Sequence, residues 1–200
     1  MKDARGGLRK GGDTDILCKS KKRAIGTKEK GGLLVATPVM LANNILRRAF
    51  RTGTYVTPIK LQKLLWFTYS EFFERTKYKT LLFDEMFRAY PNGPVSVTVK
   101  DAFQHFDEKN ITKYARESQE KVFIADEKLS PLLREVLDHI WEKYGSLPED
   151  EVVDESHKEG GAWRQVREET NWCEGNWAFI TPDHVKRGIE NEQKRANQPE

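Results

Sequence analysis

The feature that most constrains the fold is a helix start followed at once by an apolar stripe that two lysines interrupt. Thr57 can serve as an N-cap, and Pro58 suits the first helical turn. Five residues then recur at spacings of three and four: Leu61, Leu64, Leu65, Thr68 and Phe72. Lys60 and Lys63 fall outside this stripe, so the pattern predicts that both lysines face something other than the core.

The same hydroxyl-proline signal occurs at four places in the chain. These pairs are Thr37-Pro38, Thr57-Pro58, Ser130-Pro131 and Thr181-Pro182. Each predicts a helix start, because the hydroxyl accepts a backbone N–H and proline fits the first turn. The helix after residue 131 is expected to end near Gly145, and the last helix is expected to fray over residues 191–200.

The middle of the chain has a different pattern. Residues 81–83, 86–90, 111–114 and 122–124 are short apolar or alternating pieces between turn residues, which predicts a small antiparallel sheet. Residues 95–106 favour a helix, although alternation at their start leaves a strand possible there. The predicted fold class is mainly α with a small antiparallel β element (α+β), in a single compact helical domain of ordinary size.

The first 32 residues differ from the rest in charge. They hold ten Lys or Arg against four Asp or Glu, which gives them a net charge of +6 and the remainder −3. Glycine pairs and the absence of any period predict a disordered basic tail over 1–32, a domain over 33–190 and a frayed end over 191–200. This tail is either a solvated leader or a contact with nucleic-acid phosphates.

The predicted location is the cytoplasm. No run of ~20 apolar residues indicates a membrane helix. The first residues are glycines and charges rather than the apolar core of a secretory signal.

Two features are candidates for contact with a partner. Trp66 and Phe67, with further aromatic residues after them, occupy more faces of the predicted helix than a single core-facing stripe contains. They either present an aromatic surface or belong to a central helix that is buried on several sides. Asn92-Gly93-Pro94 is a turn by its chemistry, and it has either a structural role alone or presents its backbone to a partner.

Three motifs in fixed order resemble the Panacea domain of SocA-like antitoxins. Residues 57–66 match its Thr-Pro-x-Lys-Leu-Gln-Lys-Leu-Leu-aromatic segment, and residues 89–95 resemble Ala-Trp-x-x-Gly-Pro-Val. Ser156-His157 followed by Trp163 resembles its Thr-His and Pro-Trp pairs. The resemblance covers about residues 39–186.

The resemblance implies an antitoxin that binds and inactivates a cognate toxin encoded beside it. Such antitoxins are associated with phages and other genetic elements. Some similar proteins deliver the toxin to a protease, so a proteolytic adaptor is a second mechanism. The predicted partner-binding residues are Lys60, Lys63, Trp66, Phe67, Tyr90, Gly93, Pro94, His157 and Trp163. The alternative function is a nucleic-acid-binding regulator that uses the basic tail.

The residues give little support for catalysis. His157 could pair with Asp154 or Glu155, as in a hydrolase or transferase, or it could bind the backbone and pack beside Trp163. The structural role is favoured because no partner motif accompanies the histidine. No nucleotide-binding loop and no metal-ligand spacing occur. We therefore predict a protein that is not an enzyme and needs no cofactor or metal.

Overall fold

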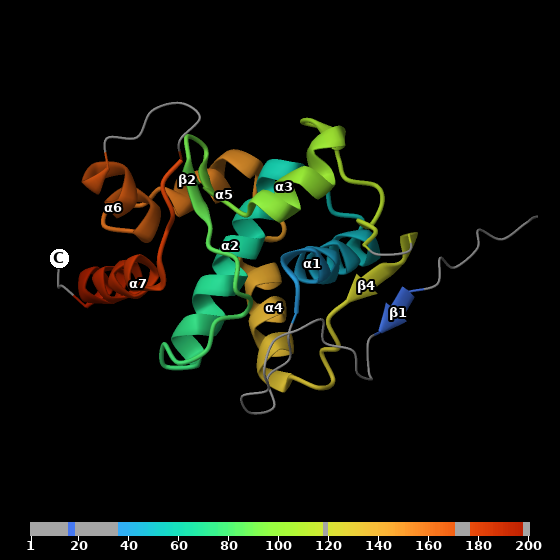
Figure 1. Ribbon diagram of the computed structural model, residues 1–200, viewed down its shortest axis with the longest axis horizontal. Coiled ribbons are helices and arrows are strands. Elements are labelled where there is room, and N and C mark those ends of the chain that lie inside the picture. The colour runs from blue at the N-terminus through green and yellow to red at the C-terminus, as the bar shows by residue number, and fades with distance from the viewer. Residues whose placement is uncertain (1–15, 19–35, 118–119, 171–176, 198–200) are drawn as a thin grey trace, which may run out of the picture.

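The computed structural model describes residues 16–18, 36–117, 120–170 and 177–197. The elements, in chain order, are β1 (Ile16–Cys18), α1 (Pro38–Thr52), α2 (Pro58–Arg75), β2 (Arg88–Tyr90), β3 (Gly93–Val95), α3 (Val97–Phe103), a 3-10 turn (Gln104–Phe106), β4 (Val122–Ile124), α4 (Pro131–Tyr144), α5 (Glu149–Ser156), α6 (Ala162–Glu169) and α7 (Pro182–Ala196). Helices dominate this part of the chain, and α6 and α7 lie at the end opposite β1 and β4 (Figure 1). The predicted fold class is confirmed.

All four predicted helix starts are confirmed. The side-chain oxygen of Thr37, Thr57, Ser130 or Thr181 accepts the backbone N–H three residues later at the start of α1, α2, α4 or α7. His184 is half-buried and completes a capping box with Thr181. The helix α7 continues to Ala196.

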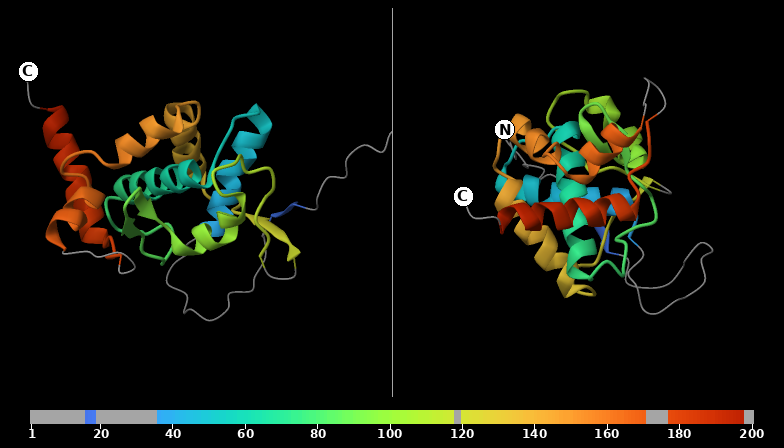
Figure 2. Two further views of the ribbon diagram at one scale, coloured as in Figure 1. Left: turned by 90° about the horizontal axis from the view of Figure 1, so that it is seen from above. Right: turned by 90° about the vertical axis from the view of Figure 1, so that its left-hand side faces the viewer.

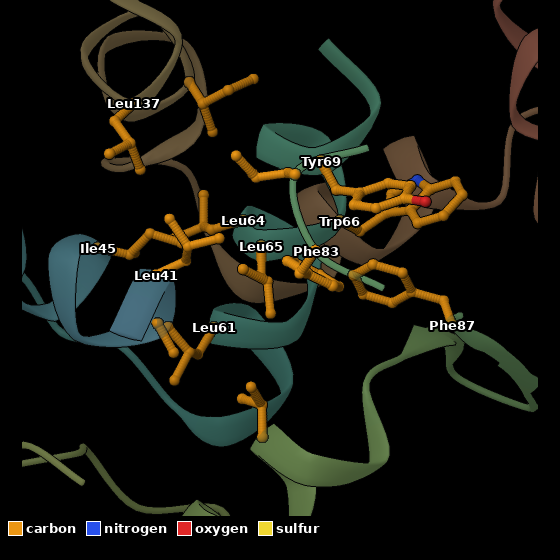
Figure 3. Packing of buried hydrophobic residues seen from close by; sticks show 14 of the residues in the cluster. Leu41, Ile45, Leu61, Leu64, Leu65, Trp66, Tyr69, Phe83, Phe87 and Leu137 are labelled. Atoms are coloured by element: carbon orange, nitrogen blue, oxygen red, sulfur yellow. The ribbon is translucent and has the colours of Figure 1, made fainter. Parts of the chain in front are cut away.

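The helix α2 is the centre of the core. It packs against α1, α3, α4, α5 and α7, and Figure 2 shows α1 and α7 at opposite ends of it. Leu64 lies between Leu41 of α1 and Leu137 of α4, while Trp66 faces Phe87 (Figure 3). The central-helix alternative is therefore correct for the aromatic run.

No helix among the described residues is long and apolar enough to cross a membrane.

The β elements only partly match the prediction. β2 and β3 form an antiparallel hairpin with Tyr90 opposite Gly93. Residues 178–180 run beside β2: the N–H of Ala89 donates to the carbonyl of Ala178, and the N–H of Ile180 donates to the carbonyl of Phe87, just before β2. Residues 81–83 and 111–114 are not strands. Their apolar residues, such as Phe83 and Ile111, enter the core from loops.

The strand β4 pairs in parallel with β1, so the prediction of one antiparallel sheet is wrong for residues 122–124. Ile16–Cys18 are also ordered as a strand, where a disordered tail was predicted. The rest of the tail lies outside the described residues. The division into 1–32, 33–190 and 191–200 stays a prediction.

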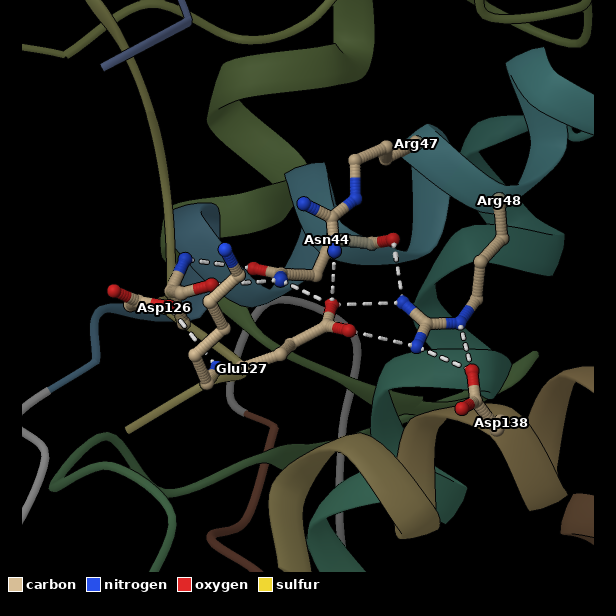
Figure 4. A network of polar contacts seen from close by, with 8 residues as sticks. Asn44, Arg47, Arg48, Asp126, Glu127 and Asp138 are labelled. Atoms are coloured by element: carbon tan, nitrogen blue, oxygen red, sulfur yellow. Dashed lines mark hydrogen bonds and ion pairs between the residues drawn. The ribbon is translucent and has the colours of Figure 1, made fainter. Parts of the chain in front are cut away.

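Buried polar side chains of α1 hold the segment that contains β4. Asn43 binds the backbone of Ala115 and Phe123, and Asn44 exchanges two hydrogen bonds with the backbone of Ala125. Arg48, only 4% exposed, donates to both carboxylate oxygens of Glu127 and to Asp138 of α4 (Figure 4). This network ties α1, α4 and β4 together.

Candidate functional site

The three motifs converge on the hairpin of β2 and β3. Pro91 and Asn92 form its exposed turn. Gly93 follows with a φ of 102°, which side chains other than glycine rarely adopt. A Cβ atom on Gly93 would lie 2.7 Å from Nζ of Lys63 and 2.8 Å from Oγ of Ser156. Glycine is therefore required both for the turn and for its close approach to α2 and α5.

Two polar residues of α2 bind the strand that follows the turn. Gln62 donates from Nε2 to the carbonyl of Ser96 at 3.1 Å and accepts the Ser96 N–H at 2.9 Å. Nζ of Lys63 donates to the carbonyl of Pro94 at 3.2 Å. Because both backbone groups of Ser96 and the carbonyl of Pro94 are satisfied from α2, the hairpin is fixed against the central helix.

Lys60 binds a different segment. Its Nζ donates to the carbonyl of Gly145 at 2.8 Å and to that of Leu147 at 2.6 Å, just after α4. Glu149, at the start of α5, accepts the hydroxyl of Thr57. The positive end of the α2 dipole also stabilises a carboxylate at this position. The loop after α4 is thus joined to the start of α2.

The expectation that Lys60 and Lys63 face away from the core is wrong. Lys60 is 5% exposed and Lys63 is 1% exposed. The spacing of a single stripe suggested exposure, but α2 is surrounded, so its remaining faces are buried too. The lysines satisfy backbone carbonyls of neighbouring segments rather than steer a partner.

Burial changes the electrostatics of these lysines. Loss of solvent lowers the pKa of Lys63 to about 7, and the negative charge of Glu149 only partly opposes this. Burial lowers the pKa of Lys60 in the same direction. Burial also raises the pKa of Glu149, while the backbone of Lys60 opposes that change.

The third motif supports the other side of the hairpin. Nε1 of Trp163 in α6 donates to the carbonyl of Tyr90 at 2.8 Å. The ring of His157 stacks on Trp163, with centroids 3.9 Å apart and planes 15° apart. Burial, and then the charge of Lys63, lowers the pKa of His157, while the backbone of Asn92 acts in the opposite direction.

The structural role favoured for His157 agrees with this packing beside Trp163. Its Nε2 is buried and has no hydrogen-bond partner among the described residues. The acidic residues of α5 do not join it in a metal site, because the described part of the chain contains no group of three or more His, Cys, Asp or Glu arranged to hold an ion.

The aromatic candidates have packing roles in this structure. Trp66 is buried against Phe87, with ring centroids 5.1 Å apart, and Phe67 stacks on Tyr144 at 4.5 Å. Gly93 and Pro94 are also buried. Of the predicted partner-binding residues, Phe67, Tyr90 and His157 are half-buried and the other six are buried.

A pocket of about 230 Å³ lies beside the hairpin. Its lining combines the first two turns of α2, the hairpin, and α3 with the 3-10 turn after it. The lining residues are Pro58, Ile59, Gln62, Lys63, Tyr90, Pro91, Asn92, Val95, Lys100 and Gln104. A second hollow of about 380 Å³ lies across the first turn of α2 and includes Tyr55, Leu147 and Pro148.

The sequence pattern placed Asn92 in a candidate turn but did not indicate Ile59, Pro91 and Lys100 as surface residues of this site. What could have indicated their exposure is their position in the sequence rather than their residue type. Ile59 lies on the opposite side of the first turn from the apolar stripe, and Pro91-Asn92 form the tip of a turn whose following Gly-Pro pair is needed for its shape. Pro91 and Asn92 are exposed although the adjacent Gly93 is buried.

The fold and site define a mainly helical protein whose central helix fixes a short β-hairpin beside a pocket. The sequence model of the SocA-like antitoxin family, described as the Panacea domain, matches residues 61–164, just over half of the chain. The chain belongs to this family. The match takes in the hairpin and the third motif. No curated protein and no solved structure matched the chain. Membership gives the protein a general role in toxin–antitoxin systems.

Proposed function

We propose that the protein neutralises a cognate toxin by binding it directly, with the exposed side of the hairpin site as the interface. This surface consists of the turn Pro91-Asn92, the first turn of α2 at Pro58 and Ile59, and Lys100 of α3. The observation that carries the proposal is that all three family motifs position one hairpin whose tip is exposed beside a pocket.

The way the hairpin is held supports binding without reorganisation. Gln62, Lys63 and Trp163 fix its backbone from two sides. A surface that is already ordered loses less conformational entropy on association, so more of the contact energy remains as affinity. Half-buried Pro58 and Ile59 offer apolar area in a concave setting, which suits an inserted side chain.

The proposal changes the role given to charge. Lys60 and Lys63 are buried, so exposed Lys100 at the pocket rim is the cation available for electrostatic attraction of a toxin. The buried lysines act earlier, because they determine the position of the surface that the toxin meets.

The test is co-expression with the small protein encoded next to this chain, followed by affinity capture and a growth assay. Ile59→Glu introduces a charge into the pocket, and an acidic residue in the first turn of α2 is compatible with the helix dipole. We expect at least tenfold weaker capture and loss of protection. Leu129→Glu is the matched control, because Leu129 is 61% exposed and outside the pocket lining.

The interpretation fails if Ile59→Glu folds, as judged by circular dichroism, and still captures the toxin as well as the control does. If neither the wild type nor the variants capture the toxin while growth is protected, direct binding itself is wrong. Protection should also saturate at about one antitoxin per toxin bound, whereas an enzyme that modifies the toxin would protect at a small fraction of that ratio.

A proteolytic adaptor would use the same interface with a different outcome. In that case the toxin level falls after synthesis is stopped, and the fall requires a protease. With simple neutralisation the toxin level stays constant in the complex. The nucleic-acid alternative depends on residues 1–32, most of which lie outside the described residues, and no described contact favours it.

A further inference from the structure

We propose that the hairpin pocket binds a small carboxylate with an apolar body, which Lys100 attracts and the amine of Lys63 binds. This goes beyond toxin binding, because it assigns the pocket a ligand of defined chemistry. The ligand is either a free organic acid or the carboxyl-terminal residue of a protein, since both carry a carboxylate beside an apolar group.

Charge in the pocket is one-sided. Its lining includes Lys63 and Lys100, and none of the described lining residues is Asp or Glu. Lys100 is exposed, and no carboxylate within the described ranges forms an ion pair with it. An anion entering the pocket therefore meets the positive charge of Lys100 and the amine of Lys63 without competition from a lining carboxylate.

The walls of the pocket are mainly apolar. Pro58 and Ile59 of α2, Tyr90 and Pro91 of the hairpin, and Val95 of β3 contribute hydrocarbon or aromatic surface. A volume of about 230 Å³ suits one aromatic ring or one short branched chain rather than a larger cofactor. The ligand therefore needs a compact apolar body as well as its charge.

Polar recognition is limited to few groups. The amide of Gln62 lines the pocket, but both of its ends already bind the backbone of Ser96. Lys63, in contrast, has one hydrogen-bond acceptor within the described part of the chain, the carbonyl of Pro94. An ammonium group has three donors, so Lys63 has capacity left for a carboxylate oxygen.

Among the described residues, four charged or titratable groups lie around Lys63. The negative charge of Glu149 in α5 favours the charged form of Lys63, and the charge of Lys63 lowers the pKa of His157 just after α5. Lys100 and Tyr90 line the same pocket. The pKa of Lys63 is about 7, so the amine is mostly neutral at pH 7.5. A bound carboxylate would favour the charged form, and binding would take up a fraction of a proton.

The experiment is isothermal titration of the full chain at pH 7.5 with phenylacetate, phenylacetamide and benzylamine. We expect phenylacetate to bind at least tenfold more tightly than the other two. Repeating the titration in buffers of different ionisation enthalpy should show uptake of up to about 0.7 proton. Lys100→Gln should weaken phenylacetate binding about two- to fivefold, as for an exposed ion pair, while Lys109→Gln, an exposed lysine outside the pocket lining, should not.

Acetylphenylalanine and its amide distinguish the two sources of the carboxylate. Binding of the acid at least as tightly as phenylacetate indicates a protein carboxyl terminus, and binding of phenylacetate alone indicates a free acid. The proposal is overturned if neither acid binds at 10 mM, if phenylacetamide equals phenylacetate, or if Lys100→Gln and Lys109→Gln behave alike. These titrations need no toxin, so their failure leaves the toxin-binding proposal standing.

Discussion

Replacing Lys63 by Met should remove a specific pH dependence from the stability of the fold. Lys63 is 1% exposed, and burial lowers its pKa from 10.5 to about 7. In the unfolded chain the lysine regains its ordinary pKa. Between these two values the unfolded state binds more protons than the folded state, so the free energy of unfolding rises with pH.

The size of the effect follows from the two pKa values. Each pH unit in this window contributes at most about 1.4 kcal/mol. Because the folded amine is half charged at pH 7, the slope is smaller there and steepens toward pH 8. The gain from pH 7 to pH 9 should be about 2 kcal/mol. Burial raises the pKa of Tyr69 to about 12 and also raises that of Tyr144, so these tyrosines act mainly above this range.

Urea unfolding followed by circular dichroism at pH 7, 8 and 9 measures this for the wild type and for Lys63→Met. Methionine has similar length and fits buried surroundings without a charge. All other titrating groups are shared, so the difference between the two proteins reports Lys63 together with its electrostatic effect on His157 and Glu149. Parallel stability profiles would refute the reasoning, since they would show that the amine keeps its ordinary pKa in the fold.

Three further substitutions test other contacts, each by urea unfolding at pH 7. Arg48→Met removes the two-pronged partner of half-buried Glu127, which keeps Arg47 and Asn44, and should cost about 1–3 kcal/mol; an unchanged free energy of unfolding would contradict the network. Gly93→Ala should cost about 1–3 kcal/mol because of its positive φ, and less in a Lys63→Ala background, which removes the two lysine atoms nearest to the added Cβ but leaves Oγ of Ser156. Gln62→Leu leaves the buried backbone N–H of Ser96 unpaired, while the Ser96 carbonyl keeps the N–H of Lys100, and should cost about 1–3 kcal/mol; an unchanged midpoint would show that water replaces the amide.

The helix starts were predictable because their signal is local. A hydroxyl at the N-cap and a proline after it act within one turn, so Thr37, Thr57, Ser130 and Thr181 each do in the structure what the sequence indicates. The hairpin turn was equally local. Gly93 has the positive φ that a turn of this kind needs.

The positions of Lys60 and Lys63 were not predictable from one stripe. Helical spacing tells which residues share a face, but not how many faces a helix buries. Since α2 contacts helices on several sides, these lysines enter the interior and bind carbonyls from segments more than 30 residues away. The crowded aromatic residues were the available sign of a central helix, and that alternative proved correct.

The pairing of β4 could not be read from its own residues either. Val122, Phe123 and Ile124 are all buried, as in a strand that is covered on both faces. Parallel pairing requires a partner strand from elsewhere in the chain, and β1 comes from a basic stretch without alternation. The local pattern of β1 is too short to reveal a strand.

The mixed character of residues 57–66 has a structural explanation in these contacts. Its leucines fill the core, whereas Lys60, Gln62 and Lys63 bind backbone groups of the loop after α4 and of the hairpin. Because these side chains bind backbone groups, they hold the hairpin in place without determining which residue types lie on its surface. Ile59 and the turn at Pro91 can therefore change to suit a different partner at little cost to the fold. The binding surface should accordingly be sought at the residues that this segment positions, rather than in the segment's own buried side chains.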